Sequence, residues 1–278
     1  MFQYAYVKAL SLRNKEKFTL DISEFEHYKL HKYGLEVFAI DKSYAAQNKV
    51  PFYENIWSNN TYWNFLWLKI TWILKRLNPN HHYEKQFHFD ETMLGITTGY
   101  IEWYFQSEKY FADFSDEIRK DFAFVKEISS KNKETIQTIN ACNAVSLHIR
   151  RWDYVSNPAN GFYNVCDLNY YQRAMEYVAT HVADPIFFIF SDDIQRARNN
   201  LKSNYTHHYI DWNSADTNYE DMRLMSLCKH NIIANSSFSW RWAWLNTNPN
   251  KIVVGPKRRF STDKLNYNDV IPSSWIKI

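Results

Sequence analysis

The sequence predicts an α/β fold built on a parallel sheet, and three observations carry that prediction. Short apolar runs alternate with helix-like segments throughout the second half of the chain. Those runs are nearly continuous in their apolar character, which is typical of strands buried on both faces. The first half is rich in aromatic residues and reads mainly as helix. The sheet is therefore expected in the second half.

The expected elements of the first half are mostly helical, with one strand and two loops. We predict helices over 2–13, 60–77 and 108–124, a strand over 17–22, and loops over 78–82 and 129–134. The second loop lies close to the expected boundary between an N-terminal domain, 1–140, and a C-terminal domain, 141–278.

The second half is expected to alternate regularly between strands and helices. The strands are predicted over 144–149, 186–190, 208–210, 231–234 and 251–254, and the helices over 168–181, 194–201, 219–230 and 238–246. This pattern is that of a Rossmann-type nucleotide domain, although the dinucleotide glycine fingerprint is missing.

Composition limits the classes of protein to which this chain can belong. Its 278 residues are 45% hydrophobic and 18% aromatic, with 5 Gly and 7 Pro, so the chain is globular. The formal charge of +3 is too small to indicate a nucleic-acid partner. Cys142, Cys166 and Cys228 are odd in number and lack C-x-x-C spacing. This usage favours a reducing cytoplasm and argues against a disulfide framework or a zinc site.

One apolar segment, residues 62–77, bears on localisation. It is too short to span a bilayer and is interrupted by Lys69, so a core helix is the favoured interpretation. An amphipathic helix on a membrane surface is the alternative, because the segment is rich in Trp and ends in Lys75 and Arg76. We expect no signal peptide before the domain, because the sequence opens directly on residues 1–5. We expect a cytoplasmic protein, with peripheral contact to the inner face of the membrane as an alternative.

The most informative stretch is residues 145–154, where an apolar run ends in His148, Arg150, Arg151 and Asp153. Placing a guanidinium group near a core costs free energy unless an anion lies against it. The paired N–H donors of the group match the oxygens of a phosphate. Open α/β sheets bind ligands at this edge. The alternatives are a surface ion pair of either arginine with Asp153 and, for His148, a hydrogen-bonded core histidine.

Two further polar clusters follow predicted strands and should reach the same edge. Asn235, Ser236 and Ser237 open a predicted helix, so they are either an N-cap or an anion site at the helix N-terminus. Asp192 and Asp193 either cap the next helix or accept the paired N–H donors of a guanine base.

These groups indicate the class of chemistry. The chain shows no Walker loop, metal-ligand cluster or serine-nucleophile elbow. An arginine beside a helix N-terminus suits a diphosphate leaving group, whose growing charge needs electrostatic stabilisation without an obligatory metal. The residues alone therefore indicate a nucleotide-diphosphate-dependent transferase.

The same residues resemble a known family. His148-x-Arg-Arg-x-Asp153, followed by Tyr154, resembles the HxRRxDY motif of the α-1,2-fucosyltransferases of glycosyltransferase family 11. Residues 1–5 resemble the end of that family's N-terminal Gly-Asn-Gln-Met-Phe-Gln-Tyr-Ala signature, and residues 105–111 resemble its Trp-Gln-Ser-Glu-Lys-Tyr-Phe segment. Residues 224–240 are similar to its most recognisable stretch.

The resemblance implies a GT-B-like fold, with two Rossmann-like domains facing a cleft and the donor site mainly in the C-terminal one. It implies inverting transfer of L-fucose from GDP-β-L-fucose to the 2-hydroxyl of a terminal β-galactoside in glycan or polysaccharide synthesis. The implied reaction needs no metal or other cofactor, and the partners are the donor and a galactose-terminated oligosaccharide.

The resemblance also implies roles for individual residues. Arg150 would hold the diphosphate, and Asp153 would orient Arg150 or the acceptor. The other donor-site residues carried over by position are His148, Arg151, Asp192, Asp193, Asn235, Ser236, Ser237 and the amide of Phe238. In this set Asp192 or Asp193 would contact the guanine.

Three departures from the family pattern bear on activity. Trp152 stands where the motif has Gly, and Arg241-Trp242 where it has Trp-Gly. A glycine near phosphate usually permits close backbone approach or positive φ, which tryptophan does not allow cheaply. Met1 falls inside the N-terminal signature, so we expect the first strand and its glycine loop to be missing. The alternative function is therefore a catalytically impaired nucleotide-sugar- or glycan-binding relative.

Overall fold

The computed structural model describes residues 1–26, 33–46, 50–51, 61–150, 166–260 and 265–278, with side chains from Lys69 onward in the second helix. It divides into two compact units, Met1–Val125 and Lys126–Ile278.

Unit 2 contains the predicted parallel sheet. Its strands are β3 (Asn143–Ile149), β4 (Pro185–Ser191), β5 (His207–Ile210), β6 (His230–Ile232), β7 (Val253–Gly255) and β8 (Ile276–Lys277). They lie in the order β5-β4-β3-β6-β7-β8, and every pairing is parallel. This order runs outward from β3 in both directions, as in the doubly wound Rossmann arrangement. The order reverses between β3 and β6, which is the topological switch point where such sheets bind ligands.

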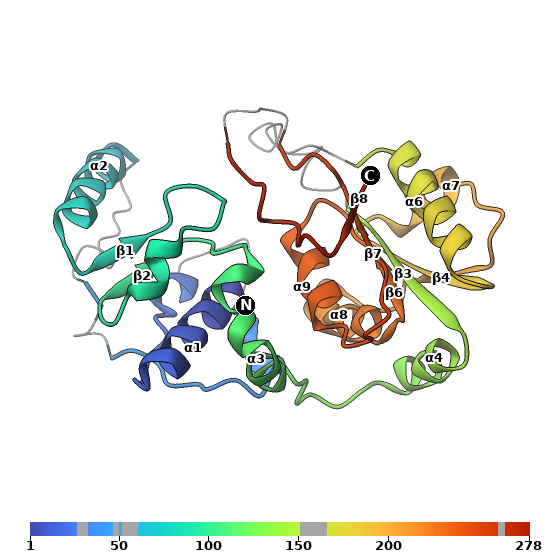
Figure 1. Ribbon diagram of the computed structural model, residues 1–278, viewed down its shortest axis with the longest axis horizontal. Coiled ribbons are helices and arrows are strands. Elements are labelled where there is room, and N and C mark those ends of the chain that lie inside the picture. The colour runs from blue at the N-terminus through green and yellow to red at the C-terminus, as the bar shows by residue number, and fades with distance from the viewer. Residues whose placement is uncertain (27–32, 47–49, 52–60, 151–165, 261–264) are drawn as a thin grey trace. The chain divides into compact units, whose positions relative to one another are not determined.

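The helices of unit 2 cover both faces of the sheet. They are α4 (Ser130–Asn140), α6 (Leu168–His181), α7 (Ile194–Asn200), α8 (Asn218–Leu227) and α9 (Ser237–Leu245). Helices α6 and α7 lie on one face, and α8 and α9 on the other (Figure 1). The prediction of alternating strands and helices is confirmed, and α6 spans the predicted residues.

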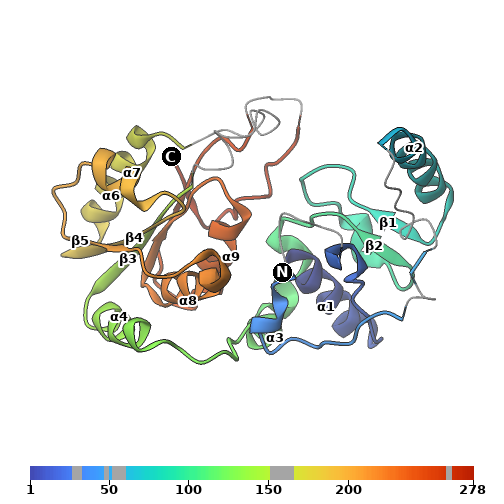
Figure 2. The ribbon, with the colours of Figure 1, turned by 180° about the vertical axis from the view of Figure 1, so that it is seen from behind.

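The expected loop over 129–134 is wrong, because α4 begins there. Ser129 caps this helix by accepting a hydrogen bond from the amide of Asn132. The helix contacts α8 and therefore belongs to unit 2 (Figure 2). The two units consequently divide at Val125–Lys126, earlier in the chain than the expected boundary after residue 140.

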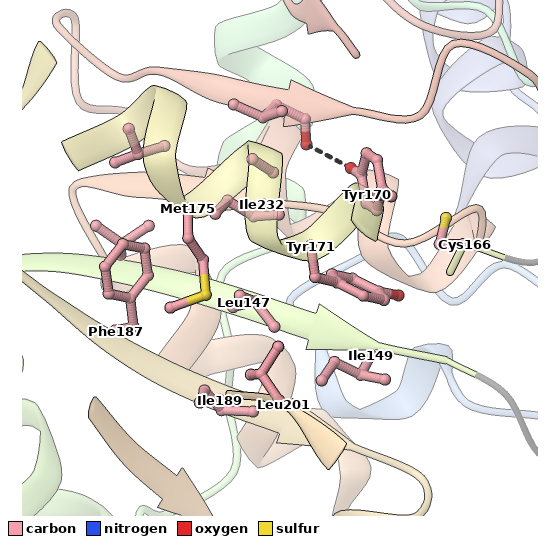
Figure 3. Close-up of a cluster of buried hydrophobic side chains, with 14 of the residues drawn as sticks. Leu147, Ile149, Cys166, Tyr170, Tyr171, Met175, Phe187, Ile189, Leu201 and Ile232 are labelled. Carbon is pink, nitrogen blue, oxygen red and sulfur yellow. Dashed lines mark hydrogen bonds between the residues drawn. The ribbon is translucent and has the colours of Figure 1, made fainter. Parts of the chain in front are cut away.

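The core of unit 2 shows the alternation expected of a buried strand. Leu147 and Ile149 of β3 point into an apolar cluster with Tyr171 and Met175 of α6 (Figure 3). Each fully buried side chain of this kind contributes roughly 1.5–3 kcal/mol to folding. Tyr170 of α6 keeps its buried hydroxyl satisfied, because it donates to a backbone carbonyl of the sheet, Ile233 O, at 2.6 Å.

The opposite face of β3 is polar but fully paired. Asn231 of β6 donates to Ser146 Oγ at 2.8 Å, and Asn246 donates to Asn231 Oδ1 at 2.7 Å. Asn246 also donates to the carbonyl oxygen of Cys228 at 2.8 Å. These buried amides hold the end of α9 against the sheet, since each would cost free energy if left without a partner.

Unit 1 is mainly helical, as expected. It contains α1 (Phe2–Asn14), α2 (Thr61–Leu77), α3 (Ser115–Asp121) and a short parallel pair, β1 (His81–Tyr83) with β2 (Tyr100–Glu102). The predictions of helices over 2–13 and 60–77 are confirmed. Both views place α1 and α2 on different sides of the β1–β2 pair (Figures 1 and 2). None of the helices formed by the described residues is long and apolar enough to cross a bilayer.

Three expectations for unit 1 are wrong. The strand over 17–22 is only an isolated bridge, Leu20 with Tyr44, because the Asp21 carboxylate accepts hydrogen bonds from Ser23 and turns the chain. The helix over 108–124 is broken into short 3₁₀ turns before α3, with Ser107 capping the first. The stretch 78–82 is not a loop throughout, because strand β1 begins at His81. The second Rossmann-like domain and its missing strand stay predictions.

A strained segment of unit 1 is held by a buried carboxyl group. Trp103 and Phe105 have φ values of 118° and 48°, which cost about 1–3 kcal/mol each in a residue with a side chain. Glu84 accepts hydrogen bonds from the amide of Phe105 at 3.0 Å and from the hydroxyl of Tyr110 at 2.8 Å. Burial raises the pKa of Glu84 to about 7. This carboxyl group therefore stabilises the segment that resembles the family's Trp-Gln-Ser-Glu-Lys-Tyr-Phe block.

Candidate functional site

The candidate site lies at the carboxyl edge of the unit 2 sheet, around the switch point. Ile149 of β3 pairs with Ser191 of β4, so Arg150 and Asp192 come next in register on neighbouring strands. Asn235 follows β6 on the other side of β3. The tertiary structure thus brings to one edge three polar groups that lie 42 and 43 residues apart in the sequence.

Arg150 forms an ion pair with Asp192. Their Nε and Oδ2 atoms are 3.5 Å apart, and the side chains are 27% and 18% exposed. A charge-assisted hydrogen bond is typically about 2.7–2.9 Å long, so this Nε–Oδ2 contact is longer than an ideal one. A partly exposed cation held in this way can turn toward an incoming anion.

Asp192 and Asp193, which sequence reasoning treated alike, have different environments. Asp193 caps α7, because its Oδ1 accepts from the amide of Arg196 at 3.1 Å. Its own amide donates to Ser191 Oγ at 3.0 Å. The capping alternative is therefore confirmed for Asp193, while Asp192 is the carboxylate directed at Arg150. A contact of either one with guanine stays a prediction.

The N-terminus of α9 opens onto the same edge. Ser236 is the N-cap, and its Oγ accepts from the amide of Phe238 at 3.2 Å. Ser237 is the first helical residue and is half-buried. The first-turn amides of a helix have no intrahelical acceptor, and the dipole favours negative charge there. The N-cap alternative is thus confirmed for Ser236, and the same geometry suits an anion.

His148 holds this helix against the sheet. It is 4% exposed, and its Nδ1 forms a hydrogen bond with Ser239 Oγ. Its ring lies 5.5 Å from Phe238 and 6.2 Å from Trp242, measured between centroids. These contacts fit the interpretation of a hydrogen-bonded core histidine. Its effect on a ligand would therefore act through the position of α9.

Sequence reasoning missed a second arginine near this edge, and this one is buried. Arg259 follows β7, is 9% exposed, and its carbonyl oxygen accepts from Asn235 Nδ2 at 2.6 Å. The signal was present, because Lys257, Arg258 and Arg259 come soon after the apolar run of β7, as Arg150 comes after β3.

A buried thiol lies beside the carboxyl end of β3. Cys166 is free, and burial raises its pKa to about 12, so the thiol stays protonated at neutral pH. Burial also raises the pKa of Tyr171 well above its ordinary value. Figure 3 shows both side chains near the end of this strand. Thiolate chemistry is therefore unsuited to this site.

Arg151, Asp153 and the Trp152 departure lie outside the described residues. Arg241 lies in α9 one turn after Ser237, and burial lowers its pKa to about 10, which leaves it cationic at neutral pH. The described residues contain no group of three or more His, Cys, Asp and Glu that could hold a metal ion. Metal independence stays a prediction.

This chain is similar to several known glycosyltransferases. An α-1,2-colitosyltransferase from Escherichia coli is 31% identical over 285 residues, covering 100% of this chain and 94% of the relative. An O-antigen biosynthesis glycosyltransferase from Escherichia coli is 39% identical over 137 residues, covering 49% and 45%. Galactoside α-(1,2)-fucosyltransferase 1 from Rattus norvegicus is 23% identical over 171 residues, covering 58% and 44%.

The family model for glycosyl transferase family 11 matches residues 2–278. That match includes the strand ends, the N-terminus of α9 and the segment held by Glu84. The family resemblance carried by the sequence motifs is therefore confirmed, and the chain belongs to glycosyltransferase family 11.

Proposed function

We propose that this protein transfers L-fucose from GDP-β-L-fucose to the 2-hydroxyl of a terminal β-galactoside, forming an α-1,2 linkage. As a family 11 glycosyltransferase it uses a nucleotide-sugar donor and a glycan acceptor. The linkage is supported by the α-1,2 specificity in the names of relatives from Escherichia coli and Rattus norvegicus. The galactoside acceptor is supported by the name of the relative from Rattus norvegicus.

One observation carries the donor assignment: Arg150 follows β3 and the N-terminus of α9 follows β6, so the two lie on either side of the switch point. A guanidinium and a helix N-terminus both bind phosphate oxygens, one by charge and one by orphan N–H groups. A nucleoside diphosphate is the ligand that such an edge accepts in doubly wound sheets.

The reaction we propose is a single displacement at the anomeric carbon of the donor. The oxygen of the acceptor hydroxyl attacks that carbon while the bond between the carbon and the diphosphate breaks. The hydroxyl proton passes to a general base, and GDP leaves with increased negative charge. Arg150 and the first-turn amides of α9 would stabilise that charge, which is where a preorganised site contributes most to the rate. Asp153 stays the candidate for orienting Arg150 or the acceptor.

A second donor deserves the same test, because the relative that covers the whole chain is a colitosyltransferase. Colitose is L-fucose without its 3-hydroxyl group. A site that hydrogen-bonds this hydroxyl rejects the deoxy sugar by roughly 10⁴–10⁵ in kcat/KM, whereas an apolar site discriminates far less. The ratio of kcat/KM for the two donors therefore decides between fucosyl and colitosyl transfer.

The test is a donor comparison with purified protein. GDP-fucose and GDP-colitose are each incubated with lactose, the product linkage is read by NMR, and GDP, ADP and UDP binding are titrated separately. Transfer of fucose in α-1,2 linkage with preference for GDP supports the proposal. Transfer of colitose without transfer of fucose would show that the donor is GDP-colitose and not GDP-fucose. GDP binding without turnover of either sugar would instead favour a catalytically impaired relative.

A further inference from the structure

An exposed face of α2 has no role in the site described above. Trp72, Ile73 and Leu77 are large apolar residues that are 59%, 48% and 73% exposed. Single exposed hydrophobic residues are ordinary in a folded protein. These three lie at positions i, i+1 and i+5, so at 100° per residue they fall within one arc of the helix. They form a stripe and are not scattered.

Two basic residues complete this arc. Lys69 and Arg76 are also exposed, and they stand at i−3 and i+4 from Trp72. The guanidinium of Arg76 lies over the Trp72 ring, 5.3 Å from its centroid. We call Lys69, Trp72, Ile73, Arg76 and Leu77 the outer face of α2. It spans about 140° of the helix.

The other side of α2 is attached to unit 1. Lys75 forms an ion pair with Glu102 of β2 at 2.7 Å, and His81 lies 3.0 Å from the same carboxylate oxygen. Burial raises the pKa of Glu102, but the hydrogen bonds from His81 and Lys75 outweigh this effect and lower it. The carboxylate therefore stays charged and holds the last turns of α2. This attachment directs the outer face away from β2.

We propose that the outer face of α2 docks the protein on an anionic phospholipid bilayer. Helix α2 contains three basic residues and no Asp or Glu, so its charge complements an anionic surface. Interfacial helices combine Trp and aliphatic residues with Lys or Arg, and the long basic side chains reach the headgroups while the apolar ones enter the interface. A helix of 17 residues with this pattern lies on a bilayer and does not cross it.

Docking would also have a consequence for the reaction. A transferase held at a membrane meets acceptors anchored in that membrane at a high local concentration. The binding itself requires neither donor nor turnover. A measurement of vesicle binding therefore gives its result whether or not the proposed function is correct.

The experiment measures partition of the purified protein onto vesicles by flotation. Vesicles of phosphatidylglycerol and phosphatidylcholine are compared with pure phosphatidylcholine, each at low and high salt. The wild-type protein should float with the anionic vesicles and be released by salt. The double variant Trp72→Ser/Ile73→Ser should bind at least tenfold less. Arg76→Gln should bind about fivefold less to anionic vesicles only, since a surface cation contributes about 1 kcal/mol.

The matched control is Leu227→Ser, which removes an exposed apolar side chain (43%) from α8 in unit 2. It should bind vesicles like the wild type, and thermal melting should show that every variant is folded. Absence of wild-type binding to anionic vesicles would overturn the proposal. Equal binding to neutral vesicles, equal loss in Leu227→Ser, or no loss in the double variant would also overturn it.

Discussion

The site assignment is tested most directly by replacing Arg150 with alanine. This change removes the guanidinium that follows β3 and leaves α9 unaltered. A charge-assisted contact to phosphate is worth roughly 1.5–3 kcal/mol, so the Kd for GDP should rise about 10- to 150-fold. Arg150→Lys keeps the charge without the fork and should fall between the wild type and Arg150→Ala.

The cost in stability should be much smaller. The pair of Arg150 with Asp192 is partly exposed and 3.5 Å long, so its loss should cost about 1 kcal/mol or less. A Tm only a few degrees lower is therefore expected. Isothermal titration with GDP measures the affinity, and a thermal melt of the same sample shows that the protein is folded.

Arg198→Ala is the matched control. Arg198 lies in α7 of the same unit and pairs with Asp211 at 2.6 Å, with both side chains about 40% exposed. Its removal should leave GDP affinity unchanged within about twofold, because it is not on the switch-point edge. Equal small losses for Arg150→Ala and Arg198→Ala would show that the phosphate site lies elsewhere.

Three further predictions concern pH, metal and buried amides. Burial raises the pKa of Glu84 from 4.5 to about 7, so its neutral form favours folding. This contribution, at most about 3 kcal/mol, is complete below pH 4.5 and is lost as pH rises through 7. Melts of Glu84→Gln from pH 4 to 8 should show a flatter pH dependence of Tm, and an unchanged slope would refute this. Fucosyl transfer to lactose should continue in the presence of EDTA. Loss of transfer with EDTA, restored by Mn²⁺ or Mg²⁺, would contradict metal independence. Asn246→Ala should lower the free energy of unfolding by roughly 2–3 kcal/mol, because it leaves the Asn231 and Cys228 oxygens unpaired. The control Asn250→Ala, at an exposed position, should lower it by less than about 0.5 kcal/mol. Urea denaturation measures both values.

Local pattern was enough to place most elements of unit 2. The helix from Leu168 to His181 follows from its 3.6-residue apolar spacing and the Asp167 cap, and both are properties of neighbouring residues. The same local reasoning failed for residues 108–124, because buried contacts of Tyr110 override helix propensity there. It also missed α4, where a single Ser cap begins a helix in a polar segment.

The candidate site was predictable in its members but not in its pairings. Parallel strands end at one edge, so residues following β3, β4 and β6 had to lie near that edge. The sequence offered Asp153 as a partner for Arg150, and that pairing stays a prediction because Asp153 lies outside the described residues. Strand register puts Asp192 beside Arg150, which the sequence did not predict. Arg259 was missed altogether, because its place beside Asn235 depends on a contact across 24 residues.

The sequence by itself determined the alternation of strands and helices, the polar residues at the strand ends and the family, since all three are patterns of nearby residues. Only the tertiary structure decided the strand order that sets β6 beside β3, the separate environments of Asp192 and Asp193, the exposure of the outer face of α2 and the raised pKa of Glu84. The physical reason is that strand order, burial and ion pairing depend on residues far apart in the chain. Their free energies are realised only when the chain has folded.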